Sequence, residues 1–284
     1  MIPGFFILPK HIVLLKGNPS MDNNAPLSEN GSCMEPLQLA GQIIMENGGE
    51  TYRAEETVCR MGEGFGLHQV ESFAVPSGLF ISYRDPRNTL ETGVKRVHRQ
   101  ETNLTRVDEV NRVSRLAAEG SITPAAAEEK LRRIARLPGT FSGPLSIAAA
   151  AVCAGGFSIL FGGSIWELLV SGAAAALVQC AGLLFGRLHL HWMSASIIGG
   201  LLTALLPNLA RLLVPSLLTE AAIAGALMPL VPGLAMTNAV QDTMRGDMVS
   251  GLSHGVQALL TACLIAGGAL LSPALLKLIL GGAA

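Results

Sequence analysis

Polar and charged side chains that could bind a solute lie close together between positions 226 and 255. An apolar run that begins at Ala226 is interrupted by two prolines and a glycine, and polar residues follow it at once. The candidate binding residues are Pro229, Pro232, Gly233, Thr237, Asn238, Gln241, Asp242 and Arg245. If a helix resumes near Ala235, the last four of these share one face at i, i+3, i+4 and i+7. Two amides, an acid and a base in a row suit a small polar or zwitterionic solute.

The prolines predict a break in the chain at this site. Within a helix, proline removes a hydrogen-bond donor and clashes with the carbonyl one turn earlier, so the segment 229–233 should be kinked or unwound. Irregular backbone at membrane depth is tolerated only where protein buries it or where it lines a wet cavity, and broken helices form solute sites in transporters. A structural interpretation stays open beside this one. In it the kink has no ligand, and Asp242 pairs with Arg245 at the membrane surface.

The charges are distributed unevenly along the chain. Charged residues make up only 14% of the sequence, whereas about 25% is usual in soluble domains. Residues 1–136 hold 33 of the 41 acidic and basic side chains, so a water-soluble front part precedes a lipid-soluble back part. The net charge of −1 gives no basic footprint, and nucleic acid is not expected as a partner. The five cysteines have no paired or metal-type spacing, so reduced structural cysteines are expected, and neither a metal nor a cofactor.

These features predict an α-helical polytopic membrane protein, with a five-helix transmembrane bundle preceded by a small α/β cytoplasmic domain. The expected parts are a disordered N-terminal tail (1–34), the α/β domain (35–138) and the bundle (139–284). The α/β domain should hold four helices and two strands around the turn at 76–78, with a third strand candidate at 92–99. The apolar start of the tail lacks the basic region and cleavage site of a signal peptide, and Met21 or Met34 is an alternative start.

Five apolar segments in the back part are each long enough to cross a bilayer, which takes about 20 residues. They lie near 142–162, 165–186, 192–214, 217–240 and 251–276. Basic residues occur on one side of these segments, at Arg132, Arg133, Arg136, Arg187 and Arg245. The opposite loops carry Glu167 and Glu220, with Arg211 as the exception. The positive-inside rule therefore places the front domain in the cytoplasm and the C-terminus outside.

Three other motifs could suggest chemistry but have plainer explanations. The G-x-S-x-G pattern around Ser253 would need a strand–turn–helix setting to be a nucleophile elbow, whereas this serine opens an apolar helix. His189 and His191 are two residues apart and do not share a helix face, so an interfacial loop is expected. Glu55 and Glu56 are expected on the solvated face of an amphipathic helix. We therefore do not expect an enzyme, and a membrane hydrolase is the weakest alternative.

Three stretches resemble one family of bacterial inner-membrane transporters, the threonine/serine exporters. They are "NGGETYRAEETVCRMGEGFG", "VESFAVPSGLFISY" and "MPLVPGLAMTNAVQDTMRGDMVSGLSHGVQALLTA". The similarity extends from Leu37 to the end of the chain. It implies a cytoplasmic domain before a five-helix bundle and export of small hydrophilic metabolites, with threonine and serine as the named substrates. Some split members of the family are associated with export of dicarboxylates such as succinate.

The resemblance also assigns individual positions. The family's P-G, N-A and D pattern falls on Pro232, Gly233, Asn238, Ala239 and Asp242, and its G-D and S-G pairs fall on Gly246–Asp247 and Ser250–Gly251. Many relatives carry arginine where this chain has His254, which puts the charge preference for the substrate in doubt. The candidates for coupling or gating are Asp242, Asp247 and His254. Asp242 comes first because a buried carboxylate can take up and release a proton.

The expected partners follow from the bundle. Solute sites in transporters commonly lie between structural repeats, and five helices without a visible inverted repeat form a poor transporter alone. We therefore expect a second membrane subunit of the same family or a homo-oligomer, besides the solute and the lipid bilayer. A non-transporting regulatory subunit is the remaining alternative.

Overall fold

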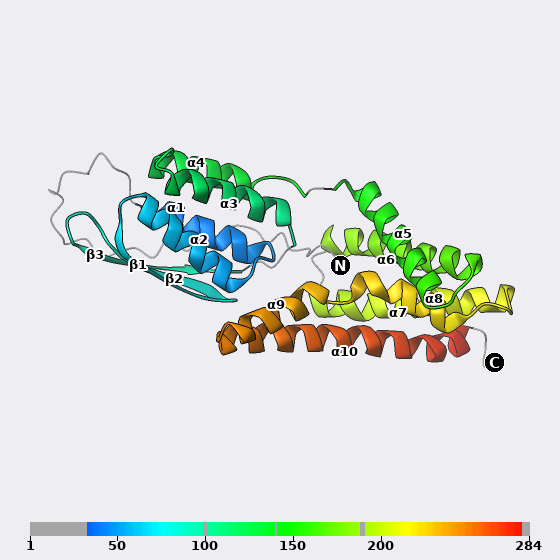
Figure 1. Cartoon of the computed structure of the whole chain (residues 1–284). Coiled ribbons are helices and arrows are strands. Elements are labelled where there is room, and N and C mark those ends of the chain that lie inside the picture. The colour runs from blue at the N-terminus through cyan, green and yellow to red at the C-terminus, as the bar shows by residue number, and fades with distance from the viewer. Residues whose placement is uncertain (1–32, 99–101, 140, 188–190, 280–284) are drawn as a thin grey trace. The chain divides into compact units, whose positions relative to one another are not determined.

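The computed structural model describes residues 33–98, 102–139, 141–187 and 191–279, and the expected N-terminal tail lies almost entirely outside them. The chain divides into two compact units, with the boundary between Pro138 and Gly139. The described chain is mostly helical, with one small sheet N-terminal to the apolar helices. Each unit is described by itself (Figure 1).

The N-terminal unit has three layers, a sheet and two pairs of helices. Its elements are α1 (Met34–Glu46), α2 (Thr51–Gly64), β1 (His68–Val75), β2 (Gly78–Arg84), β3 (Leu90–Arg96), α3 (Leu104–Ala118) and α4 (Pro124–Ala135). The sheet is antiparallel in the order β1-β2-β3. Helices α1 and α2 contact the sheet, and α3 and α4 pack on these two helices (Figure 1). The third strand that the sequence suggested is present.

Alternation along the strands gives the sheet one buried face. Leu79, Ile81 and Tyr83 are almost fully buried beneath the helices, as period-2 burial requires. The intervening Phe80 is 43% exposed on the other face. Glu55 differs from its expected solvated position, because its carboxylate accepts a hydrogen bond from the backbone N–H of Ala74 at 2.6 Å. Its function here is to hold α2 against β1.

Arg106 fixes the end of the N-terminal unit. Its Nε atom donates to the carbonyl of Leu137 at 3.1 Å, and its Nη1 atom donates to Oδ1 of Asn47 at 3.1 Å. Asn47 is itself buried and donates to the carbonyl of Ile43 at 2.7 Å. The "NGG" stretch that carries part of the family resemblance is therefore tied to the residues that lead out of this unit.

The C-terminal unit consists of helices only, among the residues described. They are α5 (Gly143–Leu160), α6 (Ile165–Arg187), α7 (Trp192–Leu213), α8 (Thr219–Leu227), the 3₁₀-helix η1 (Met228–Leu230), α9 (Gly233–Met244) and α10 (Met248–Ile279). Within the described residues, α5, α6, α7 and α10 are long and apolar enough to cross a membrane. The segment expected near 217–240 is a helix pair bent by 59°, so the count is four spans, or five if the pair forms one.

Helices α7 and α10 make the most extensive helix contact of this unit, and glycine allows it. A Cβ atom placed on Gly200 would lie 2.0 Å from the carbonyl oxygen of Ile265. A Cβ atom on Gly268 would lie 2.0 Å from the carbonyl oxygen of Ile197. The two backbones are therefore in direct contact, as small residues permit in membrane bundles.

Glu167 is a buried helix residue that hydrogen-bonds two loops, whereas the sequence suggested an ordinary loop position. It lies in the first turn of α6 and is only 1% exposed. One carboxylate oxygen accepts from the N–H and the hydroxyl of Ser164 at 2.6 and 2.5 Å, and the first of these is the reach-back bond of a capping box. The other accepts from the N–H of Leu218 at 2.6 Å. One side chain thus joins the α5–α6 turn to the loop before α8.

Candidate functional site

The two prolines break the fourth apolar segment, as the sequence predicted. Pro229 lies in η1, Pro232 is the N-cap residue of α9, and the helix resumes at Gly233. This start is two residues earlier than the sequence suggested. Proline lacks the N–H that would continue the hydrogen-bond ladder, which explains why the helix stops and restarts here.

After the break, α9 and α10 form a tight helical hairpin (Figure 1). Gly246 turns the chain with a φ of +89°, a backbone conformation that glycine adopts without strain. A Cβ atom on Gly251 would lie 2.2 Å from Oγ1 of Thr243 and 3.0 Å from the carbonyl oxygen of Ala239. The absence of a side chain at Gly251 therefore lets α10 approach α9 closely.

An acid–imidazole pair joins the two helices of this hairpin. Oδ2 of Asp242 lies 2.9 Å from Nδ1 of His254, and the two side chains are 0% and 13% exposed. Asn238 lies one turn before Asp242 and is 6% exposed, so the two share the buried face of α9. When the imidazole is protonated the pair is a salt bridge, and such charge-assisted hydrogen bonds are stronger than neutral ones. This pair is the centre of the candidate site.

The other candidate residues occupy different positions around the hairpin. Thr237 is exposed, and its hydroxyl donates to the carbonyl of Gly233 at 2.6 Å. Gln241 is half-buried, and Arg245 is exposed as the C-cap residue of α9. Asp247 accepts a hydrogen bond from the N–H of Ser250 at 3.1 Å and so caps the start of α10. Asn238, Asp242 and His254 are thus brought together, whereas Thr237 and Arg245 lie toward solvent or lipid.

Ser250 falls in the S-G pair of the family resemblance, but it was not among the binding residues that the sequence predicted. It is fully buried and lies one turn before His254 on the same face of α10. Its spacing from His254 was the available signal. That signal becomes informative only when His254 is known to face α9.

The weaker motifs do not form sites in the described chain. Ser253 is exposed in the regular helix α10, without the strand–turn–helix setting of a nucleophile elbow. His191 is the N-cap residue of α7, and its Nδ1 atom accepts from the N–H of Met193 at 3.4 Å. His189 lies outside the described residues. The described ranges contain no group of three or more potential metal-binding side chains.

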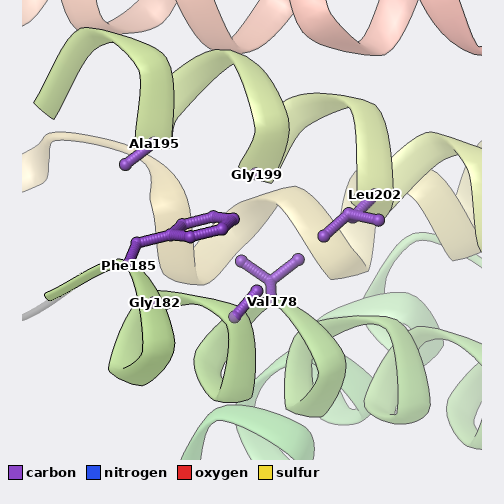
Figure 2. Close-up of a pocket in the computed structure, with 7 residues that line it drawn as sticks. Val178, Gly182, Phe185, Ala195, Gly199 and Leu202 are labelled. Carbon is purple, nitrogen blue, oxygen red and sulfur yellow. The ribbon is translucent and has the colours of Figure 1, made fainter. Parts of the chain in front are cut away.

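An apolar pocket lies between α6 and α7, and no residue of the hairpin lines it. It is lined by Val178, Ala181, Gly182, Phe185, Ala195, Gly199 and Leu202. Figure 2 shows Phe185 and Val178 pointing from α6 toward Gly199 and Leu202 of α7. All the lining side chains are apolar, and a hydrophilic solute would lose its hydrogen bonds to water without replacement. The pocket is suited to an apolar group rather than to an amino acid.

Comparison with known proteins gives a match over most of the chain. The family described as "Putative threonine/serine exporter" matches residues 37–276. The threonine/serine exporter of Corynebacterium glutamicum is 22% identical over 251 residues, which are 84% of this chain and 50% of that protein. The "Probable threonine/serine exporter" of Mycobacterium tuberculosis is 23% identical over 233 residues, which are 81% of this chain and 44% of that protein.

A third relative has a different name and length. The "Probable succinate transporter subunit YjjP" of Escherichia coli is 24% identical over 238 residues, which are 80% of this chain and 88% of that protein. This chain spans about half the length of the two exporters it matches and most of the length of the E. coli subunit. No solved structure matches the chain. The family match and the apolar helices together indicate a multi-pass membrane protein of this family.

Proposed function

Because the chain belongs to the threonine/serine exporter family, we propose that it is a secondary transporter that exports threonine, serine or a related amino acid across a bacterial inner membrane. The observation that carries this proposal is the broken fourth segment, which is followed by a buried acid–imidazole pair. Ionisable groups within membrane segments are costly and are mostly retained for function.

The pair offers one group for each charge of an amino acid. Asp242 binds the ammonium group of the solute, and protonated His254 binds its carboxylate, so contacts within the pair are exchanged for contacts with the solute. Asn238 adds a side chain that both donates and accepts hydrogen bonds. The irregular backbone at the break, from Pro229 to Gly233, provides further polar groups for the solute.

Helix α9 is the element that opens the site. It begins at the 59° bend and ends before Gly246, whose positive φ allows a tight turn. Its extensive contact is with α10 alone among the described helices. A segment of this kind, between a bend and a glycine turn, can move as a rigid body and expose the buried pair.

The same pair couples transport to a proton. Asp242 is released from His254 when the carboxylate takes up a proton, and the pair forms again when the proton leaves. Asp247 caps α10 beside this pair, so it holds the turn about which α9 moves. These three residues therefore supply coupling and gating, while Gln241, Thr237 and Arg245 lie along the route of the solute.

The arrangement in the membrane follows from the basic residues. We place the α/β domain (35–138) in the cytoplasm and the C-terminus outside, because Arg132, Arg133 and Arg136 precede α5. The bundle (139–284) then crosses the membrane five times, with the bent pair of α8 and α9 as the fourth span.

A dicarboxylate exporter subunit is the second candidate function. It is favoured by length, because this chain covers 88% of the E. coli protein named as a succinate transporter subunit. In this case a second membrane subunit completes the transporter. We propose such a subunit, or a second copy of this chain, for the amino-acid exporter as well, since a transporter site commonly lies between repeats.

Transport by inside-out vesicles distinguishes these candidates. Vesicles that contain the chain and any co-purifying membrane subunit are expected to accumulate labelled threonine or serine when the lumen is made acidic, and not succinate. Uptake of succinate alone would establish the second candidate. If no solute accumulates with both subunits present, the chain is a regulatory subunit. Purification of a functional monomer would contradict the proposed partner.

A further inference from the structure

The hydroxyl group of Ser250 is buried without a hydrogen bond. Its residue is 0% exposed, and Oγ has no partner among the described residues. Oε1 of Gln241, on the other helix of the hairpin, is also buried without a partner in the described chain. Buried polar atoms are nearly always hydrogen-bonded in proteins, so each exception needs a specific explanation.

Within the described part of its own helix, the hydroxyl group of Ser250 has no acceptor. Serine and threonine commonly donate to the carbonyl four residues earlier. Thr243 does so in α9, donating to Ala239 at 2.7 Å, and Thr261 does so in α10, donating to Gln257 at 2.8 Å. Ser250 does not, because it lies in the first turn of α10: the residue four positions earlier, Gly246, precedes the helix, and its carbonyl accepts from the N–H of Met248 at 3.0 Å. Its hydroxyl therefore stays available for a group from outside the helix.

The position of Ser250 indicates what that group is. The serine lies about one helical turn, roughly 5 Å, from His254 on the same face of α10. The N–H of Ser250 donates to Oδ1 of Asp247, with 3.1 Å between the nitrogen and the oxygen, and this bond fixes the backbone of Ser250. A small amino acid bound between Asp242 and His254 therefore places its side chain within reach of this hydroxyl.

We propose that Ser250 binds the side-chain hydroxyl of the solute and sets a preference for hydroxylated amino acids. This inference rests on the proposed function. The charged pair takes the ammonium and carboxylate groups, and the remaining polar group of such a solute both donates and accepts, as does Ser250. A site built to hydrogen-bond a hydroxyl discriminates strongly against an analogue that lacks it.

The test compares threonine with 2-aminobutyrate, which lacks only the hydroxyl, in the vesicles described above. The wild-type chain is expected to transport threonine at least about tenfold more efficiently. Ser250→Ala should lower the efficiency for threonine about tenfold and leave 2-aminobutyrate unchanged. The matched control is Ser253→Ala, three residues along the same helix at an exposed position, which should keep the wild-type preference.

Thermal unfolding separates this role from a structural one. Ser250→Ala removes no hydrogen bond of the described structure, so its melting temperature should equal or exceed that of the wild type. An unchanged threonine preference, or equal losses for both amino acids, would overturn the inference. A loss confined to succinate would show that Ser250 binds a carboxylate instead. If the wild type transports neither amino acid, the proposed function fails and this inference fails with it.

Discussion

Replacing Gly268 with alanine is expected to destabilise the C-terminal unit by about 3 kcal/mol or more, the upper end of the range for overpacking. The new Cβ atom would lie 2.0 Å from the carbonyl oxygen of Ile197 and 2.9 Å from the N atom of Leu201. These are backbone atoms, which cannot move aside as the end of a flexible side chain can. Helices α7 and α10 would therefore have to separate along their whole contact.

Gly267 provides a control for this variant in the adjacent position. A Cβ atom there has no heavy atom of the described structure within 4 Å, and the residue is exposed. Gly267→Ala should leave stability unchanged or raise it by up to about 1 kcal/mol, because alanine is the better helix former. Unfolding of the purified protein in detergent, followed by heat or denaturant, measures both variants. Equal transitions for the two would show that α7 and α10 are not in backbone contact.

Replacing Glu167 with alanine is expected to cost about 3 kcal/mol, because it leaves three donors without their acceptor. The lost partners are the N–H and hydroxyl of Ser164 and the N–H of Leu218. Hydrogen bonds to charged groups contribute about 1.5–3 kcal/mol each, and part of this loss is recovered when water reaches the freed donors. Glu167→Gln should fall between alanine and the wild type, since its amide nitrogen faces a donor.

Glu220 is the matched control for the charge of Glu167. It also lies in the first turn of a helix, but its side chain is exposed. Glu220→Gln should change stability by less than about 0.5 kcal/mol, as is usual for exposed positions. If Glu167→Ala unfolds at the same temperature as Glu220→Gln, then Glu167 does not connect the two loops.

Hydropathy and turn chemistry predicted the elements better than their contacts. The long apolar runs and the strands around Pro76–Gly78 could be read from the sequence, since local pattern determines them. The break at Pro232 was also predicted, because proline acts through its own covalent structure. The 59° bend and the earlier restart at Gly233 depend on packing that the sequence does not show.

In the candidate site, too, the local pattern could be predicted and the contacts between helices could not. The polar face from Asn238 to Asp242 was visible as helical spacing, whereas the partner of Asp242 lies twelve residues away on another helix. Glu167 was expected in a loop. Its role as an acceptor for the N–H of Leu218 was not visible, because Leu218 is 51 residues further along the chain. Contacts between distant residues are set by how helices pack, and one sequence gives no direct signal for them.

The most direct test of the proposed exporter is transport by Asp242→Asn in inside-out vesicles with an acidic lumen. Asparagine keeps the size of the side chain beside His254 but cannot exchange a proton, so gradient-driven accumulation of threonine or serine should fall about tenfold or more, at least 1.4 kcal/mol in the barrier. Val240→Ala, at an exposed position of α9, should transport as the wild type does. If Asp242→Asn accumulates solute as fast as the wild type and depends equally on the gradient, the hairpin is not the site of coupled transport.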